Sequence, residues 1–365
     1  MQENISLAPY TSLGIGGPTP YFTEARSENT VLDAVEFSRA HNLPLCVLGG
    51  GSNILISDSG FPGLVLQVAI PGISMSQDGD SVTVSVGAGV RWDPLVADCV
   101  DRGLAGIECL SGIPGWVGGT PVGNVGAYGQ EVSAVISNVR AYDRQHGNII
   151  DMSNAQCRFA YRSSVFNTTA RNRYIVLKVE YVLEKGGAAC VRYSELERFF
   201  RGRTPTLSEV RVAVRKIRAD KAMLLVEGDA DCRSAGSFFK NPVVSEATFA
   251  SIEAVGVDRG VLGPGRRLPR FPASAGQVKA PAAWLIEQAG FPKGCSRGNV
   301  GLSRKHALAL VNRGGATADE VLAFAGEIQE AVESTFGVRL AAEPAFVGFS
   351  EEVRRRFGAA GPNGP

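Results

Sequence analysis

Glycine is the residue type that most constrains how this chain can fold, because it is both abundant and clustered. The chain contains 44 glycines in 365 residues, about 12% against a usual share of about 7%. Only 256–276 and 358–365 have the composition of a linker or a disordered loop. The densest clusters instead separate segments with strand or helix patterns, and lie at residues 14–17, 49–51, 87–89 and 112–129. These clusters indicate tight turns and close backbone approaches inside folded domains.

The balance of charges excludes two classes of partner. Lys and Arg number 37 and Asp and Glu 36, a net charge of +1, whereas binding nucleic acid or a membrane surface needs an excess of basic residues. Hydrophobic residues make up 44% and charged residues 20%, which is ordinary for a chain that buries a core. No apolar run approaches the ~18 residues of a membrane helix, and no basic residue precedes Arg26 as in a secretory signal. We expect two or three domains that bind neither nucleic acid nor membrane.

The cysteines and histidines indicate a reducing compartment and no metal centre. The seven cysteines are dispersed and contain no C-x-x-C pair, which is typical of reduced thiols in a cytosol. His41, His146 and His306 lie too far apart in sequence to form a local metal-binding signature. We therefore expect a cytoplasmic protein without a bound metal.

The first 70 residues have an α/β pattern. Residues 27–41 carry apolar side chains at helical spacing, and the short apolar runs 43–48 and 63–68 fit buried strands. Residues 81–90 alternate strictly between apolar and polar or small side chains, which predicts a further strand.

The next segment predicts a helix over 93–102. Asp93 is a candidate N-cap, Pro94 suits the first helical position and Gly103 a helix stop. Strand-like runs recur between residues 135 and 183 and indicate a second α/β unit.

The pattern changes beyond residue 226. Helices are predicted over 281–289 and over 317–336, the second with a capping box at Thr317 and Glu320 and a stop at Gly337. Residues 338–347 alternate like a strand and place Glu343 on the less apolar face, so the pattern alone predicts a solvated carboxylate.

The segment Gly49-Gly50-Gly51-Ser52-Asn53 directly follows an apolar strand pattern. Such a turn can point several backbone N–H groups into one concavity and bind a phosphate without a basic side chain. A glycine-rich hairpin is an equally weighted alternative. Two familiar nucleotide signatures are missing, because the sequence has no G-x-G-x-x-G and no glycine followed directly by lysine.

Residues 111–129 (SGIPGWVGGTPVGNVGAYG) form a second glycine-rich segment with seven glycines in nineteen residues. Ile113, Trp116 and Val117 need burial, which a flexible linker would not provide. The many glycines would let the backbone lie against a long, flat ligand. The segment is better interpreted as a backbone-lined cofactor groove than as a linker.

Several motifs occur in one order along the chain: Thr11-Ser-Leu-Gly-Ile-Gly-Gly17, Gly49–Asn53, Ile113–Gly129, Cys157-Arg-Phe-Ala-Tyr161-Arg162-Ser-Ser, Gly236-Ser237-Phe-Phe-Lys240-Asn241-Pro and Ala283-Trp-Leu-Ile-Glu-Gln-Ala-Gly290. In this order the chain resembles the UDP-N-acetylenolpyruvoylglucosamine reductase family of flavoenzymes, in its longer-loop subclass. The match extends from about residue 4 to Gly348. Several independent motifs in one order are more specific than any single glycine run.

The resemblance implies a mixed α+β and α/β fold. A two-part FAD-binding domain of the vanillyl-alcohol-oxidase-like type would precede a C-terminal α/β substrate-binding domain. The stretch 256–276 matches no family motif and is expected to be a surface loop. The expected division of the chain is 1–70 and 71–225 for the two FAD-binding subdomains, 226–337 for the substrate-binding domain, 338–349 for a C-terminal strand carrying Glu343, and 350–365 for a disordered tail.

The resemblance also implies a reaction. The family binds FAD non-covalently and uses NADPH to reduce UDP-N-acetylglucosamine enolpyruvate to UDP-N-acetylmuramate, a peptidoglycan precursor. Hydride addition to the terminal vinyl carbon leaves negative charge on the adjacent carbon and its carboxylate, so the site needs cationic groups and an acid. The matching positions are Arg162, Ser237 as the proton donor, and Glu343. Outside these motifs, Arg162 would be interpreted as a surface ion-pair partner and Ser237 as a turn residue.

Binding residues are implied in the same way. Contacts to FAD are expected at Gly49, Gly50, Gly51, Ser52, Asn53, Pro114, Gly115, Gly118, Gly119, Asn124, Gly126, Ala127 and Tyr128. Contacts to the substrate are expected at Tyr193, Lys221, Asn241 and His306, and Tyr128 is expected to face the nucleotide sugar. A lysine suits a diphosphate as a point charge. Tyr193 would fold over the substrate as a lid, or else be a core tyrosine that precedes a helix N-cap.

Two positions depart from the family pattern. Gly123 stands where a glutamine is usual, and Ala341 replaces the first acid of the usual L-E-x-E ending. Neither change removes a presumed catalytic group.

Two alternatives stay open at this point, a flavin oxidase of the wider FAD-binding family and a non-catalytic flavin-binding module. An oxidase would not need the segment 236–242 or Glu343, and loss of Ser237 or Glu343 would have favoured the module. Covalent FAD is disfavoured, because no histidine follows Asn53 until His146. We expect a monomer.

Overall fold

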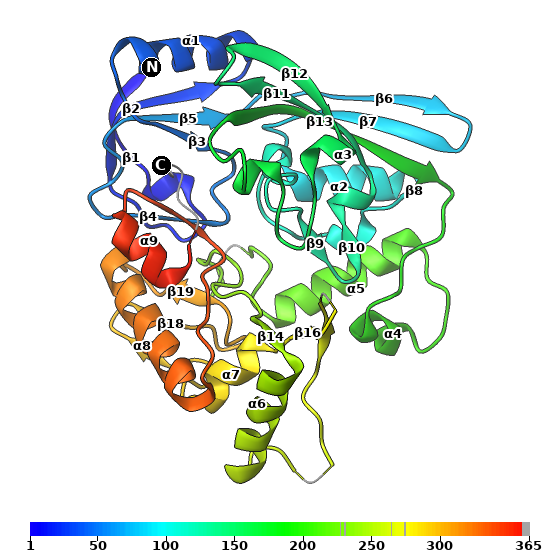
Figure 1. Cartoon of the computed structure of the whole chain (residues 1–365). Helices are drawn as coiled ribbons and strands as arrows, with labels where there is room; N and C mark the ends of the chain where they lie inside the picture. Colours follow the sequence, from blue (N-terminus) through cyan, green and yellow to red (C-terminus); the bar gives the residue numbers. More distant parts are fainter. Residues whose placement is uncertain (227, 230, 264, 274, 360–365) are drawn as a thin grey trace.

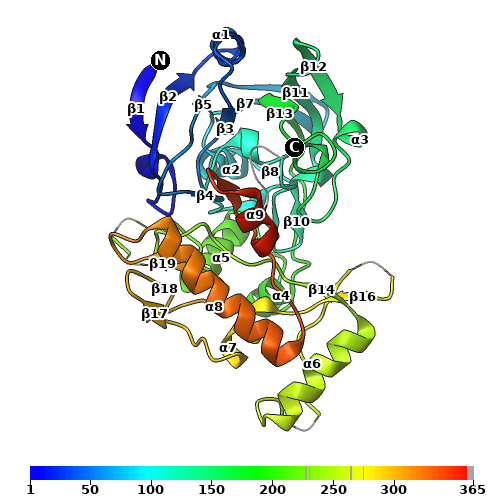
Figure 2. The ribbon, with the colours of Figure 1, turned by 60° about the vertical axis from the view of Figure 1, so that its left-hand side comes forward.

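The computed structural model describes residues 1–226, 228–229, 231–263, 265–273 and 275–359 (Figures 1 and 2). The N-terminal part (residues 2–185) holds two neighbouring sheets. The C-terminal part (residues 243–357) lies beneath them in the view of Figure 1. Parallel and antiparallel pairing both occur, so the expectation of a mixed α/β fold is confirmed.

The first sheet has four strands in the order β1-β2-β5-β3. β1 is antiparallel to β2, whereas β2 and β3 both run parallel to β5. Helix α1 (Glu28–Ala40) packs on this sheet through the apolar face predicted by its spacing, and Ser27 caps it. The strands are β1 (Gln2–Ser6), β2 (Pro18–Ala25), β3 (Leu45–Leu48) and β5 (Leu64–Val68).

The second sheet is antiparallel and has the order β12-β11-β13-β7-β6, with β8 paired to β13 off this path. Helix α2 (Trp92–Asp101) covers it with Trp92, Leu95 and Val96. The strands are β6 (Ile73–Asp78), β7 (Ser81–Gly87), β8 (Leu104–Ala105), β11 (Ile136–Asp143), β12 (Asn148–Ser153) and β13 (Tyr174–Lys185). The strands predicted over 81–90 and between 135 and 183 are therefore confirmed.

The expected N-cap of α2 is wrong. The helix begins at Trp92, with Arg91 as its N-cap residue, and Gly103 follows its C-terminus as predicted. The carboxylate of Asp93 accepts the Gly112 N–H at 2.6 Å and pairs with Arg211 at 2.6 Å and with Arg215. These arginines lie on α5 (Leu207–Asp220), so the side chain of Asp93 pairs with a segment distant in sequence. Nothing in the sequence of α2 itself indicates that pairing.

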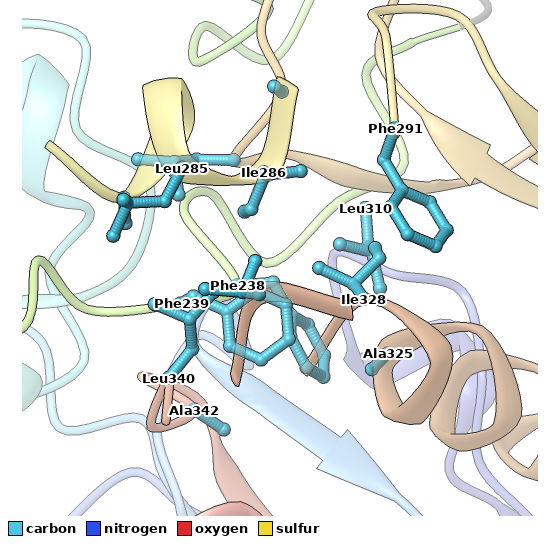
Figure 3. Close-up of a cluster of buried hydrophobic side chains, with 14 of the residues drawn as sticks. Phe238, Phe239, Leu285, Ile286, Phe291, Leu310, Ala325, Ile328, Leu340 and Ala342 are labelled. Carbon is cyan, nitrogen blue, oxygen red and sulfur yellow. The ribbon is translucent and has the colours of Figure 1, made fainter. Parts of the chain in front are cut away.

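The C-terminal part is built from helices and short strands around one core. Figure 3 shows Phe238 and Phe239 inside this core, between Leu285 and Ile286 on one side and Leu340 and Ala342 on the other. The predicted helices are present as α7 and α8, and α8 has the Thr317 capping box and the Gly337 stop. The elements are α6 (Glu246–Asp258), α7 (Ala282–Gln288), α8 (Ala318–Phe336), β14 (Val243–Ser245), β15 (Phe271–Pro272), β16 (Gln277–Lys279), β17 (Ser296–Arg297), β18 (Val300–Leu302) and β19 (Leu310–Asn312).

The strand predicted over 338–347 is shorter than expected. Only β20 (Ala345–Val347) is a strand, and it pairs in parallel with β4 (Ile54–Ile56) of the N-terminal part. Residues just before it pair with a different segment, through an isolated bridge between Phe239 and Ala342. The chain thus changes partners near Pro344, which offers no backbone N–H to a ladder.

Two expectations about loops also need correction. Glu351–Phe357 form helix α9, capped by Ser350, so disorder is wrong for this part of the tail. Residues 360–365 lie outside the described residues. The stretch 256–276 is not wholly a loop, because α6 extends to Asp258 and β15 pairs with β16.

Within the described ranges, no helix is long and apolar enough to cross a membrane. All seven cysteines are free thiols, and burial raises the pKa of Cys46 and of Cys99 to about 12. A thiol with such a pKa is almost entirely protonated at neutral pH and is a poor nucleophile.

Candidate active site

The two glycine-rich loops predicted to bind a cofactor lie against each other. Ser52 Oγ donates a hydrogen bond to the Pro114 carbonyl at 3.1 Å. A Cβ added to Gly50 would lie 2.9 Å from the Cα of Gly115. Gly51 has φ +62, and its Cβ would lie 1.8 Å from the Tyr10 carbonyl oxygen. These glycines are required because backbone meets backbone without room for a side chain.

Other glycines of the same loops have an open side. A Cβ built on Gly49, Gly119 or Gly123 would meet no described heavy atom within 4 Å. Hydrogen bonds fix the backbone of two of them: Gln67 Nε2 donates to the Gly49 carbonyl at 3.2 Å, and Gly119 N donates to the Trp116 carbonyl at 3.0 Å. A flat cofactor can therefore approach a fixed backbone surface here, which fits FAD. Gly123, where the family has a glutamine, leaves this side more open.

We expect Gly49→Ala and Gly51→Ala to have different effects. Gly51→Ala should lower the free energy of unfolding of the FAD-free protein by about 1–3 kcal/mol, since the new methyl group overlaps Tyr10. Gly49→Ala should leave that stability nearly unchanged but raise the dissociation constant for FAD about tenfold. Denaturant unfolding and FAD fluorescence titration measure the two effects. Unchanged FAD affinity in Gly49→Ala would contradict the groove assignment.

Hydrogen bonds within the protein hold the end of the glycine-rich segment 111–129. Asn124 is 1% exposed, and its Nδ2 donates to Glu131 Oε2 at 2.9 Å and to the Ala160 carbonyl at 3.0 Å. Its Oδ1 accepts the Ser133 N–H at 3.1 Å. The side chain of Asn124, expected to contact FAD, is therefore engaged in holding the loop. Gly126 and Ala127 follow as strand β9 (Gly126–Ala127), paired with β10 (Gln130–Glu131).

Arg162 and Glu343 form an ion pair, although they lie in different parts of the chain. Arg162 Nε lies 3.2 Å from Glu343 Oε1, and the two side chains are 30% and 21% exposed. Arg162 Nη1 also donates to the Gly126 carbonyl at 2.9 Å, which joins the pair to the predicted cofactor loop. Arg162 has φ +52, so its backbone is in the left-handed region. The solvated Glu343 that the strand pattern predicts is therefore wrong.

Ser237 is brought beside this pair by backbone pairing. Glu343 N donates to the Phe238 carbonyl at 2.8 Å, and Lys240 N donates to the Ala341 carbonyl at 2.9 Å. The two phenylalanines after Ser237 are at most 1% exposed and anchor this segment in the core (Figure 3). Ser237 itself is half-buried at the end of the pairing. The three presumed catalytic positions thus gather at one place.

Two of the four expected substrate contacts, Tyr193 and Lys221, lie together with Tyr128. The rings of Tyr128 and Tyr193 meet edge to face at 5.5 Å between centroids. Lys221 Nζ lies 6.0 Å from the Tyr128 ring centroid and pairs with Glu195 at 2.6 Å. Tyr193 is the N-cap residue of α4 (Ser194–Phe200). It packs with Cys109, Tyr128 and Leu196, so it is placed at a packed helix start in this structure.

The other two expected substrate contacts are His306 and Asn241. Burial lowers the pKa of His306 to about 4, and the positive charges of Lys221 and Lys293 act in the same direction. Asn241 Oδ1 accepts the Ala282 N–H at 2.9 Å, which caps the start of α7. Its side-chain oxygen therefore has a structural partner.

Two cations were not singled out by the sequence. Lys279 on β16 places Nζ 3.4 Å from the centroid of the Tyr161 ring, next to Arg162. Burial lowers the pKa of Lys279, and the positive charge of Arg162 also lowers it. Arg218 on α5 is 8% exposed, and its Nη2 donates to the Met223 carbonyl at 2.6 Å. In the sequence, Lys279 is recognisable only as a lysine just before the predicted helix 281–289. Arg218 is recognisable only as an arginine one helical turn before Lys221.

The lowered pKa of His306 predicts how stability changes with pH. Its pKa falls from 6.5 to about 4 on folding, so the neutral form is favoured in the native state. Stability from this group is present above pH 6.5 and is lost as pH falls toward 4. We expect His306→Gln to lose less stability than the parent protein over this window. Urea unfolding at several pH values measures the difference, and parallel curves would show that His306 makes no such contribution.

Comparison with known proteins identifies one family. A family model described as "UDP-N-acetylenolpyruvoylglucosamine reductase, C-terminal domain" matches residues 228–347, and a model of an FAD binding domain matches residues 19–153. A UDP-N-acetylenolpyruvoylglucosamine reductase from Thermobifida fusca (strain YX) is 46% identical over 351 residues, which cover 95% of this chain and 98% of that protein. One from Streptomyces coelicolor is 44% identical, with coverages of 94% and 89%. The solved structure of such a reductase from Thermus caldophilus superimposes with a TM-score of 0.63 and 25% identity, and covers 94% of this chain and 98% of that one.

Proposed function

The chain belongs to the UDP-N-acetylenolpyruvoylglucosamine reductase family, and on that premise we propose how its own residues perform the reaction. The protein is an FAD-dependent oxidoreductase that uses NADPH to reduce UDP-N-acetylglucosamine enolpyruvate. Its product, UDP-N-acetylmuramate, is a precursor of peptidoglycan. The observation that carries the assignment of residues is the Arg162–Glu343 ion pair beside Ser237, where three segments remote in sequence converge.

The two glycine loops form the FAD site. Backbone N–H groups of Gly49–Asn53 would hold the diphosphate of FAD, in place of basic side chains. The segment 114–128 would hold the flavin ring, and the open side of Gly119 would leave the backbone accessible to it. The close packing of Gly50 on Gly115 and the open side at Gly49 and Gly119 support this arrangement. When bound, FAD supplies the hydride that the substrate receives.

The chain's own residues stabilise the charge that develops on the substrate. Arg162 is oriented by its hydrogen bond to Gly126 and its pairing with Glu343, so it can face the substrate carboxylate as that group gains negative charge. Lys279 adds a second positive charge at the same place, beside Tyr161. Ser237 donates the proton to the carbon next to the carboxylate. A neutral hydroxyl is a weak acid, so nearby cations help by stabilising its alkoxide.

The nucleotide end of the substrate binds on the other side of the loop. Lys221 attracts the diphosphate, and Tyr128 and Tyr193 provide a ring surface for the sugar. Arg218 adds a buried positive charge behind Tyr128. His306 is neutral at physiological pH and serves as a hydrogen-bonding group. Asn241 holds α7 in place, and its amide group faces the substrate.

Spectroscopy of the purified protein tests the function directly. The FAD-loaded protein is yellow, should be bleached by NADPH under anaerobic conditions, and should regain its colour stoichiometrically when the enolpyruvyl nucleotide is added. The oxidase alternative predicts recovery with oxygen and no effect of that nucleotide. A non-catalytic flavin-binding module predicts no bleaching by NADPH. Either of these two outcomes would sink the proposal.

Further properties belong to the same proposal. The protein works in the cytoplasm, consistent with seven free cysteines. It acts as a monomer and needs no nucleic acid. Its parts are divided as the family pattern implies: 1–70 and 71–225 for FAD, 226–337 for substrate, and 338–349 for the segment that returns Glu343 to the active site.

A further inference from the structure

A cleft with four arginines lies on the N-terminal part, and no role in the reaction accounts for it. The cleft has a volume of about 340 Å³ and is lined by Arg39, Arg144, Gln145, Arg171, Asn172 and Arg173. Its walls come from the end of α1, the turn between β11 and β12, and the segment that leads into β13. Figures 1 and 2 both place α1 and β12 at the end of the molecule opposite α6.

The lining of the cleft is unusual in its charge. It contains four guanidinium groups and no carboxylate. Asp143, which precedes the lining residue Arg144, is 2% exposed and pairs with Arg173, whose Nη2 lies 2.7 Å from Asp143 Oδ2. Hydrogen bonds from Arg173 and His146 hold the pKa of Asp143 far below its usual range. This carboxylate therefore neutralises Arg173 and leaves the other three arginines.

The other three arginines are held by neutral acceptors. Arg39 Nη2 donates to the Arg144 carbonyl, and Arg144 Nη1 donates to the Asn172 carbonyl at 2.8 Å. Arg171 Nη2 donates to the Asn167 carbonyl at 2.7 Å. Carbonyls fix the direction of a guanidinium group but do not cancel its charge. Three positive charges are thus oriented around one cleft, and among the described residues no carboxylate lies within 4.0 Å of their guanidinium nitrogens.

Arg144 bears an electrostatic cost in the protein alone, whereas Arg39 and Arg171 are exposed to solvent. Burial lowers the pKa of Arg144, and the positive charge of Arg39 lowers it further. The whole chain has a net charge of only +1, so the cluster is a local concentration and not part of a basic surface. An anion in the cleft would remove the repulsion, and a planar fork of donors suits the oxygens of phosphate.

From this geometry we propose that the cleft is a second anion site, which binds a small ligand carrying a diphosphate or several phosphate groups. A single carboxylate would neutralise only one of the three uncompensated guanidinium groups, whereas a diphosphate matches their charge and can contact several of them. The volume of the cleft suits a ligand of this size. Its residues are separate from the presumed catalytic and substrate-binding positions, so this site is additional to the active site.

Titration with inorganic diphosphate tests the proposal. The FAD-loaded protein is titrated calorimetrically with and without UDP-N-acetylmuramate. This nucleotide displaces diphosphate from the active site, so the binding that remains is binding in the cleft. Arg39→Ala/Arg171→Ala should weaken the remaining binding at least about tenfold. Arg26→Ala/Arg102→Ala removes two exposed arginines from the same part of the chain, so its net charge is equal, and it should change the affinity less than about twofold.

A second experiment decides whether the phosphate ligand is a lipid headgroup or a free anion. Sedimentation with vesicles of phosphatidylglycerol and phosphatidylcholine compares a lipid headgroup with the free anion. Loss of vesicle binding in Arg39→Ala/Arg171→Ala, with weak binding of free diphosphate, would identify the headgroup as the source. The FAD content and melting temperature of each variant verify that it is folded.

The site is refuted if both arginine pairs change diphosphate affinity equally. Failure of the parent protein to bind either diphosphate or the anionic vesicles has the same meaning. Binding of an RNA oligonucleotide alone would also overturn the proposal, because it would indicate a macromolecular partner. None of these outcomes depends on the proposed reductase activity, which the anaerobic assay tests separately.

Discussion

Ser237→Ala is expected to reduce the rate of flavin reoxidation by the enolpyruvyl nucleotide roughly 10²–10⁴-fold, the usual range for loss of a general acid. Reduction of the flavin by NADPH should be unchanged, because only the second half-reaction requires a proton at the substrate carbon. Anaerobic stopped-flow spectroscopy measures the two half-reactions separately. The neighbouring Phe238 and Phe239 remain in the core and keep the segment in place, so the variant should fold.

A conservative variant separates proton donation from packing. A thiol has a lower pKa than a hydroxyl group, so Ser237→Cys should recover part of the lost rate if the side chain donates a proton. Rates for Ser237→Cys no higher than for Ser237→Ala would argue for a role in packing. Equal losses in both half-reactions of Ser237→Ala would also contradict the assigned role.

Disruption of the Arg162–Glu343 pair is expected to have the second largest effect. Arg162→Ala should lower the rate of reoxidation about 10²–10³-fold, comparable to the loss of one donor that stabilises charge in a transition state. Glu343→Gln should produce a loss of similar size, since the carboxylate orients the guanidinium group at 3.2 Å. The double variant should be little worse than either single one, because the two residues act as a unit.

An exposed pair provides the matched control. Arg203 and Glu209 lie 2.7 Å apart, but their side chains are 57% and 41% exposed. Their replacement by Ala and Gln should change the reoxidation rate less than about twofold. If the losses in transition-state stabilisation of the two single variants add up in the double variant, Arg162 and Glu343 act independently, contrary to the shared role proposed for them.

Local patterns predicted the regular elements of the chain well. The ends of α8 follow from Thr317 and Gly337, because a cap acts on N–H and carbonyl groups within one helical turn. The glycine clusters also indicated close backbone packing correctly, as at Gly50 and Gly51. Each of these predictions depends on residues that are near one another in sequence.

Predictions failed where a distant segment competed for the same group. Asp93 was expected to cap its own helix, but Arg211 on α5 pairs with it and Gly112 donates to it. Glu343 was expected to face solvent, but the segment before it pairs with Phe238 and Lys240 and brings it to Arg162. Alternation along a strand cannot register a partner that arrives from another part of the chain.

The sequence by itself determined the family of this protein, its reaction and the set of residue types available for catalysis. It did so because ordered motifs and short-range spacing are properties of the linear chain. Only the tertiary structure decided which of those residues meet: it paired Arg162 with Glu343, bonded the Glu343 backbone to the residue after Ser237, and placed Lys279 over the Tyr161 ring. It also gathered the four arginines of the cleft beside α1, which come from three segments that share no motif. Such meetings depend on sheet pairing and core packing across the whole chain, because these interactions fix the relative positions of side chains that are remote in sequence.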